Sequence, residues 1–195
     1  KQSLIVLADD GHSLAICTLN DIIYMNIDFT QHSSSRLLHF TSDESQEFLL
    51  FYFEDKSLIS CRIQLTNKHS YELTSFNKVD MYYLKNTCLA TIINGKNELY
   101  LHNIHLHTSS HEPIQLENEC EQLCINKSGD YVFVLVKPRI LCMYRVKDRR
   151  RLARLFVYDH VTTMTACNDF IILAMNDRRL LTLMIADPDD TMLQS

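Results

Sequence analysis

Four histidines lie within ten residues of this chain: His102, His105, His107 and His111. Imidazole nitrogens are good ligands for zinc and copper, so a metal site is the chemistry that this stretch could support. The spacing H-x2-H-x-H-x3-H matches no standard metal-binding pattern, however, and the serines and threonine between the histidines are typical of a surface loop. We therefore expect a polar loop here, with no metal and no cofactor.

A second candidate ligand pair is Cys120 and Cys124, which three residues separate. In a regular strand, residues four apart face the same side but lie about 13 Å apart, so they cannot share one ion without a bend. Most of the seven cysteines fall within apolar strand patterns. Buried thiols behave as small hydrophobic groups, so we expect core thiols in a reducing intracellular compartment.

Catalytic chemistry has no supporting motif. Neither G-x-S-x-G nor H-E-x-x-H occurs, and the glycine-rich patterns that bind nucleotide phosphates are also missing. Asp9, Asp10 and His12 have the residue types of an acid–base catalytic group, but a polar turn between two strands explains them better. We expect a protein that is not an enzyme.

The basic run Lys147, Arg149, Arg150, Arg151 and Arg154 could bind an acidic partner or a phosphate-bearing surface. A solvated turn, balanced by nearby aspartates, is the simpler interpretation. The formal net charge of −5 argues against broad nucleic-acid binding. The longest apolar runs, such as 48–53, have six residues, whereas a membrane helix needs about 20. We expect neither nucleic acid nor membrane as a partner.

The elements that position these residues belong to a pattern that returns five times, at 3–19, 48–63, 88–104, 131–146 and 170–185. Each copy is an apolar run, a tight polar turn and a second, alternating run. Equivalent positions are 44, 41, 42 and 39 residues apart. A period near 40 residues made of short strands is typical of a β-propeller, with one blade per repeat.

The expected fold class is therefore all-β, a β-propeller of four-stranded antiparallel blades with strands in the order a–b–c–d. The b strands are apolar on both faces, which predicts burial between neighbouring blades. The whole chain, 1–195, forms about five blades, at roughly 1–30, 31–77, 78–117, 118–159 and 160–195. The first lacks its a strand and the last its d strand, so we expect part of a larger ring.

This pattern resembles the WD-repeat propellers, in a degenerate form. The family's tryptophan slots hold Cys17, Cys61, His102, Tyr144 and Leu183, and the chain has no tryptophan. The family's aspartate in the b–c turn is matched by Asp10, Asp55 and Asp177, and its d–a histidine by His160. The resemblance implies that part of the family's buried hydrogen-bond network forms between His160 and Asp177.

Residues 156–190 also look like the WD-repeat region of the NACHT and WD-repeat domain-containing proteins. That resemblance implies a propeller downstream of a nucleotide-switched oligomerisation domain, where it senses a partner or holds the switch closed. We expect a cytoplasmic, non-enzymatic protein-interaction module, a scaffold or regulatory sensor within a larger protein. Its partners would be other proteins or its own upstream domains.

Loops carry function because rigid strands position them, so the partner site is expected on the face built from the b–c turns and the d–a segments, such as 31–35. The residues that we expect to bind a partner are Asp10, His12, Asp55, Lys56, Lys96, Lys137, Arg139, Asp177 and Arg178. The alternative is a pocket at the central axis, in an enzyme or a small-molecule binder. The ionisable groups near the innermost strands would then be His39, Asp80 and His160.

Overall fold

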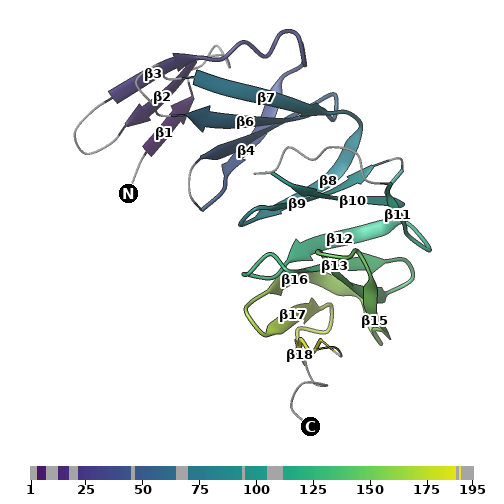
Figure 1. Ribbon diagram of the computed structural model, residues 1–195. Coiled ribbons are helices and arrows are strands. Elements are labelled where there is room, and N and C mark those ends of the chain that lie inside the picture. Colours follow the sequence, from purple (N-terminus) through teal and green to yellow (C-terminus); the bar gives the residue numbers. More distant parts are fainter. Residues whose placement is uncertain are drawn as a thin grey trace. The chain divides into compact units, whose positions relative to one another are not determined.

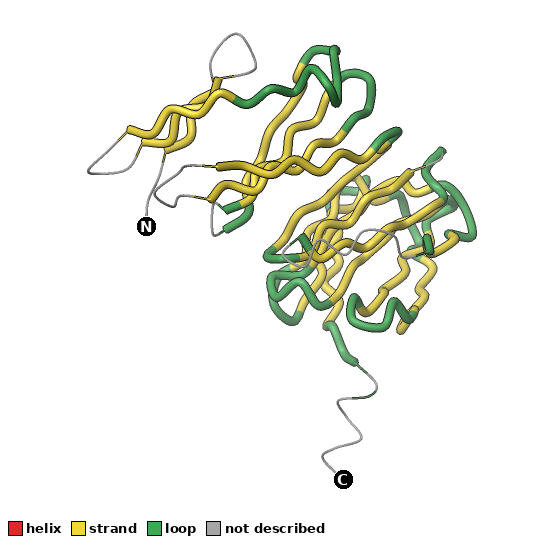
Figure 2. The backbone as a smooth tube through the Cα atoms, turned by 45° about the horizontal axis from the view of Figure 1, so that its top comes forward, coloured by secondary structure: helices red, strands yellow, loops and turns green. Residues whose placement is uncertain are grey.

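The computed structural model describes residues 4–7, 13–17, 22–44, 47–64, 70–93, 95–104, 112–187 and 189. All regular structure in this part of the chain is β-strand (Figure 1 and Figure 2). The described residues form no helix that could cross a membrane. The chain divides into two compact units, Lys1–Val79 and Asp80–Ser195, and each is described by itself.

The first unit holds two antiparallel sheets, whose strands follow one another in sequence order. The three-stranded sheet consists of β1 (Leu4–Leu7), β2 (Ser13–Cys17) and β3 (Ile22–Asn26). The four-stranded sheet consists of β4 (Leu37–Ser42), β5 (Phe48–Phe53), β6 (Leu58–Gln64) and β7 (Ser70–Phe76). Phe29 follows the first sheet and packs on Phe51 of the second, with ring centroids 4.7 Å apart, so the linking segment joins the core.

The second unit holds three more antiparallel sheets. The first consists of β8 (Val79–Lys85), β9 (Cys88–Ile93), β10 (Glu98–Asn103) and the short β11 (Ile114–Gln115). The next consists of β12 (Cys120–Ile125), β13 (Tyr131–Val136), β14 (Ile140–Arg145) and β15 (Arg151–Phe156). The last consists of β16 (Val161–Ala166), β17 (Phe170–Met175) and β18 (Leu180–Met184).

The core of this unit lies between successive sheets, and β13 contributes to both of its layers. Val132 and Val134 pack with residues of β9 and β10 in one cluster. Phe133 and Leu135 pack with residues of β16 and β17 in the other. Burying such side chains stabilises the fold by roughly 1.5–3 kcal/mol each. The prediction that the b strands are buried on both faces is confirmed for β5 and β13, but it is wrong for β17, where fully buried residues alternate with more exposed ones.

A β-bulge interrupts three of the a–b pairs at the same place, the second residue of the a strand. The extra residues are Leu38, Glu121 and Thr162. Because a bulge reverses the side to which the following residues point, Cys120 and Cys124 enter different core clusters. The expectation that these two thiols face the same side is wrong for this reason, whereas their assignment to the core is confirmed.

An ion-pair network joins the segment that follows β18 to the end of β14. The Arg145 guanidinium lies 3.0 Å from Asp187, 2.6 Å from Asp189 and 2.6 Å from Asp148. The Tyr131 hydroxyl donates a second hydrogen bond to Asp187, at 2.9 Å. The side chains of Arg145 and Asp187 are only 7% and 3% exposed. Ion pairs as well as apolar packing therefore hold the last sheet against its neighbour.

Arg145→Met is expected to lower the melting temperature markedly, because it leaves the buried Asp187 carboxylate without its cation. The control Arg150→Met removes a 59%-exposed cation 3.7 Å from Asp189 and should have a small effect. Thermal unfolding followed by circular dichroism measures both. Equal melting temperatures for the two variants would contradict a stabilising role for the network.

The same comparison has a defined pH dependence. The hydrogen bond from Arg145 lowers the pKa of Asp148 from 3.8 to about 2. Because this folded-state pKa is depressed, the stabilisation is present above pH 3.8 and is lost as pH falls toward 2. The melting-temperature difference between wild type and Arg145→Met should therefore shrink as pH falls across that interval.

Thiol labelling tests the core assignment. Burial raises the pKa of Cys61, Cys88, Cys120 and Cys124 to about 12, and only a thiolate reacts readily. Cys167 is exposed. At pH 8, a disulfide reagent should modify Cys167 in the folded protein and the four buried thiols only in urea, as located by peptide mass spectrometry. Rapid native labelling of Cys120 or Cys124 would contradict this packing.

Candidate functional site

The turns between second and third strands lie at one edge of each antiparallel sheet, together with the segments that enter the next sheet. We call this edge the b–c rim. Two of its hairpins have the same geometry. Lys56 and Arg178 donate their backbone N–H to Phe53 and Met175, three residues earlier, each at 3.0 Å. Each of these hydrogen bonds closes a tight turn whose last residue has a left-handed backbone conformation. This is a common form of three-residue hairpin loop.

Every described b–c turn places a cation in the left-handed region of backbone space. The φ angles are 65° for Lys56, 72° for Lys96, 68° for Arg139 and 67° for Arg178. That conformation favours glycine and costs other residues on the order of 1 kcal/mol. A charged side chain thus stands where the turn itself would accept glycine, a coincidence that spacing alone did not reveal.

In the first unit, Asp55 organises the turn before β6. Its carboxylate accepts hydrogen bonds from the Ser33 hydroxyl and the Ser57 backbone N–H, both at 2.9 Å. Burial acts to raise the pKa of Asp55, but the hydrogen bonds from Ser57, Ser33 and Ser35 outweigh it and lower the pKa. Both serines belong to the d–a segment 31–35, which was predicted from the sequence to lie on the same face as the b–c turns.

In the second unit, two predicted lysines converge on one carboxylate that sequence reasoning missed. Glu119 lies 2.5 Å from Lys137 and 3.5 Å from Lys96. The hydrogen bond from Lys137 lowers the pKa of Glu119, and the same bond raises the pKa of Lys137. Both groups therefore stay charged at neutral pH. Residues from turns of two successive sheets meet here.

Arg139 lies beside two exposed aromatic residues, Phe156 and Tyr158. Its guanidinium lies 5.2 Å from the Phe156 ring centroid and donates a 2.8 Å hydrogen bond to the Tyr158 carbonyl. Arg179 lies 5.1 Å from the Tyr158 ring. The two rings are 56% and 52% exposed. Arginine and aromatic side chains together are typical of energetically important positions in protein interfaces.

Asp177 is not paired with His160, the pairing that the resemblance to WD-repeat propellers implied. Its carboxylate accepts hydrogen bonds from Nε of Arg179, at 2.6 Å, and from the Arg179 backbone N–H. The hydrogen bond from the Arg179 side chain lowers the pKa of Asp177. His160 is exposed, and its backbone carbonyl accepts from the Asn176 N–H. The cation two residues along the turn, rather than the His160 ring, therefore holds this carboxylate.

Not every predicted residue is placed. Asp10 and His12 lie outside the described residues, as do His105, His107 and His111. His102 lies in β10, and its Nε2 is 3.1 Å from the Thr91 hydroxyl. Among the described residues, no group of three or more histidine, cysteine or acidic side chains is arranged to hold a metal ion.

The residues suggested for an axial pocket are divided between the two units. His39 is in the first unit, while Asp80 and His160 are in the second. Asp80 accepts hydrogen bonds from the Gly95 and Lys96 N–H groups, at 3.1 and 3.2 Å, so it holds a turn. His160 is exposed to solvent.

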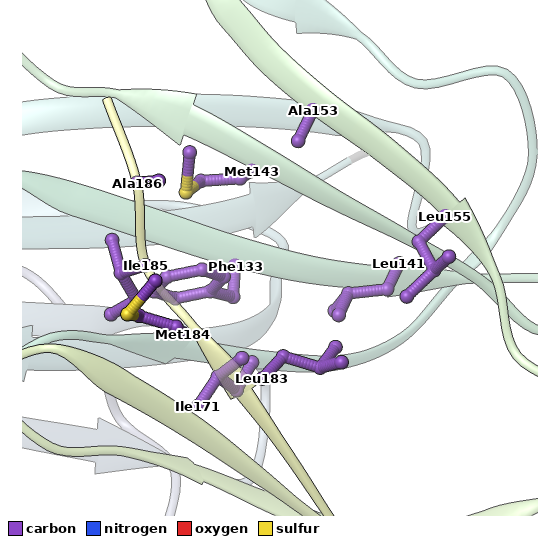
Figure 3. Close-up of a pocket in the computed structure, with 10 residues that line it drawn as sticks. All are labelled: Phe133, Leu141, Met143, Ala153, Leu155, Ile171, Leu183, Met184, Ile185 and Ala186. Carbon is purple, nitrogen blue, oxygen red and sulfur yellow. The ribbon is translucent and has the colours of Figure 1, made fainter. Parts of the chain in front are cut away.

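A cavity of about 310 Å³ lies elsewhere, between β14, β15 and β18 (Figure 3). Its wall includes Leu141, Leu155 and Leu183, whose side chains approach one another in Figure 3. The complete lining is Phe133, Leu141, Met143, Ala153, Leu155, Ile171, Leu183, Met184, Ile185 and Ala186. None of these side chains is ionisable, and none comes from an a strand. This space is an apolar gap between sheets rather than an acid–base site.

Arg178→Gly should leave the free energy of unfolding unchanged or raise it by up to about 1 kcal/mol, because glycine relieves the left-handed backbone but gains unfolded-chain entropy. Arg178→Val should lower it by about 1–2 kcal/mol. Urea denaturation measures both. The control Lys147→Gly, where φ is not left-handed, should destabilise. A large loss of stability from Arg178→Gly would show that the arginine side chain itself supports the turn.

Comparison with known proteins identifies the fold. No family model and no curated protein matches the sequence. Hsv2 of Kluyveromyces lactis is 10% identical over 97% of this chain and 61% of its own, with a TM-score of 0.68. The WD40 domain of Toxoplasma gondii coronin is 9% identical over 95% and 57%, with a TM-score of 0.58.

The RRP9 WD40 repeats are 9% identical over 78% of this chain and 52% of theirs, with a TM-score of 0.57. The chain spans about three fifths of the length of the Hsv2 structures. At these identities the likeness concerns the fold alone. It confirms the prediction from the sequence: the chain has the all-β fold of WD40 propellers, with antiparallel blades of which three have four strands in the described structure.

Proposed function

We propose that this chain is a non-enzymatic protein-interaction module that binds its partner on the b–c rim. One observation carries the proposal: each described b–c turn presents a cation from a left-handed backbone position. Strained backbone positions occupied by non-glycine residues are concentrated at functional sites. The exposed Phe156 and Tyr158 rings beside Arg139 and Arg179 add apolar contact area to this charged edge.

The charge states of the rim favour binding over acid–base catalysis. A general acid or base works best with a pKa near the working pH. On the rim, hydrogen bonds move the pKa of Glu119 and Asp177 downward and that of Lys137 upward. These shifts move away from neutrality and fix the charges, which suits electrostatic recognition of a partner.

We also propose a role for this chain within a larger protein. The WD40 fold of the chain is compatible with a scaffold or regulatory sensor within a larger protein in the cytoplasm. The partner would be another protein or an upstream domain of the same protein, as the resemblance to the NACHT and WD-repeat proteins implies. A ligand site at the propeller axis is the second candidate, and no described group of residues favours it.

A pull-down from cell extract with the full-length protein tests the proposed site. The rim variant carries Lys137→Glu, Arg139→Glu and Arg178→Glu. The control reverses three exposed charges at the opposite edge of the sheets, with Lys127→Glu, Lys147→Glu and Arg150→Glu. Both variants would first be shown to melt like wild type.

We expect partners that wild type and the control retain and the rim variant loses by at least about tenfold, as mass spectrometry quantifies. Reversing charges at a charged contact commonly costs several kcal/mol, which is more than tenfold in affinity. Identical partner sets for all three proteins would contradict a binding site on the b–c rim.

A further inference from the structure

A strip of cations runs from the b–c rim onto the outer strand β15. We call it the basic strip, and it consists of Lys96, Lys137, Arg139, Arg151 and Arg154, around Glu117 and Glu119. The two glutamates lie on the segment between β11 and β12. Backbone hydrogen bonds fix that segment at both ends, from Leu116 to Asn97 at 2.9 Å and from Cys120 to Lys96 at 2.6 Å.

A bulge in β15 brings two of these arginines to one face. Tyr144 pairs with Arg151, whereas Met143 pairs with Ala153, so Leu152 is the extra residue. Three residues apart, Arg151 and Arg154 would face opposite sides of a regular strand. With the bulge, both reach Glu117, at 2.6 and 3.1 Å. The basic run seen in the sequence is therefore divided, because Arg150 lies instead near Asp189.

Each glutamate of the strip is shared by two cations. Glu117 bonds Arg151 and Arg154, and Glu119 bonds Lys137 and Lys96. One unit of positive charge is left over at each place, and Arg139 adds another, because its side chain donates a hydrogen bond to the neutral carbonyl of Tyr158. Glu121 acts on Lys137 from nearby and Asp80 accepts a hydrogen bond from the Lys96 N–H, so the strip and its neighbouring carboxylates carry a net charge of about +1, within a chain of net charge −5.

The strip also has an apolar member. Phe156 follows Arg154 by two residues in β15 and is 56% exposed. Residues two apart point to the same face of a strand, so the ring lies beside the arginines, and Arg139 covers one of its faces. A partner would therefore meet guanidinium groups and an aromatic surface side by side.

From this arrangement we infer that the basic strip binds an extended acidic segment of a partner protein. Its Asp or Glu carboxylates would contact Arg151, Arg154 and Arg139, and a large apolar side chain would pack on Phe156. The inference rests on the proposed interaction function and names the chemistry of the partner. Guanidinium groups bind carboxylates through paired hydrogen bonds, which supplies orientation as well as attraction.

The carboxylates within the strip favour a peptide over a nucleic acid. Glu117 and Glu119 lie between the cations and Glu121 acts on Lys137 from nearby, so an unbroken phosphodiester backbone would be repelled by them. A peptide can place isolated carboxylates at the cations and apolar groups between them. Charge complementarity at a short, mixed surface of this kind supports specificity more than general affinity for polyanions.

The test is selection of random 12-residue displayed peptides on the immobilised full-length protein. We expect enrichment of Asp or Glu together with one aromatic or large aliphatic residue. A labelled peptide of the selected consensus should lose about tenfold in affinity for the variant Arg151→Gln/Arg154→Gln and for Phe156→Ser. Raising the salt from about 50 to about 300 mM should also weaken binding several-fold.

The matched control is Lys147→Gln/Arg150→Gln, which removes two cations at the opposite edge and should bind like wild type. Enriched peptides without acidic residues would overturn the inference. So would equal binding of the consensus peptide to the Arg151→Gln/Arg154→Gln variant, or capture of a 12-nucleotide single strand in place of acidic peptides.

These results separate the two proposals, because Arg151 and Arg154 lie outside the b–c turns. A cellular partner lost from the rim variant but retained by Arg151→Gln/Arg154→Gln would leave the proposed function standing and overturn the strip. A partner retained by both variants would overturn both.

Discussion

Burial of a second strand such as β13 between two sheets is the constraint on which the rest of the structure depends. A strand such as β13 has apolar side chains on both faces, and neither face is covered within its own sheet. A blade of this kind is therefore stable only against neighbours. The tight turns at the sheet edges are then free to carry charge, since the strands behind them are already fixed by packing.

The turns of the b–c rim carry charged side chains. The left-handed position in each described turn accepts a side chain that glycine would replace at little cost, and a lysine or arginine stands there. Neighbouring carboxylates hold these cations in defined positions, as Glu119 does between Lys96 and Lys137. Charge on the rim is thus arranged across successive sheets rather than within one turn.

Charge has a second use at the opposite edge, where it supports the fold. Arg145 is nearly buried and is satisfied by three aspartates, one of them almost inaccessible to solvent. A buried cation with incomplete partners would destabilise the fold, so this network requires the segment after β18 to lie in one place. The contrast with the exposed arginines of β15 explains why similar residues, six to nine positions apart, have different roles.

The sequence by itself determined the repeat, the class of fold and the strands buried on both faces, because period and apolar alternation are local properties of the chain. It also located Lys96, Lys137, Arg139 and Arg178 in turns. Only the tertiary structure decided which partners they meet. Glu117, Glu119, Phe156 and Tyr158 come from other segments, and bulges at Glu121 and Leu152 reverse side-chain direction. A one-residue irregularity leaves the hydrophobic pattern nearly unchanged but moves a side chain to the other face, so its effect is set by packing between sheets.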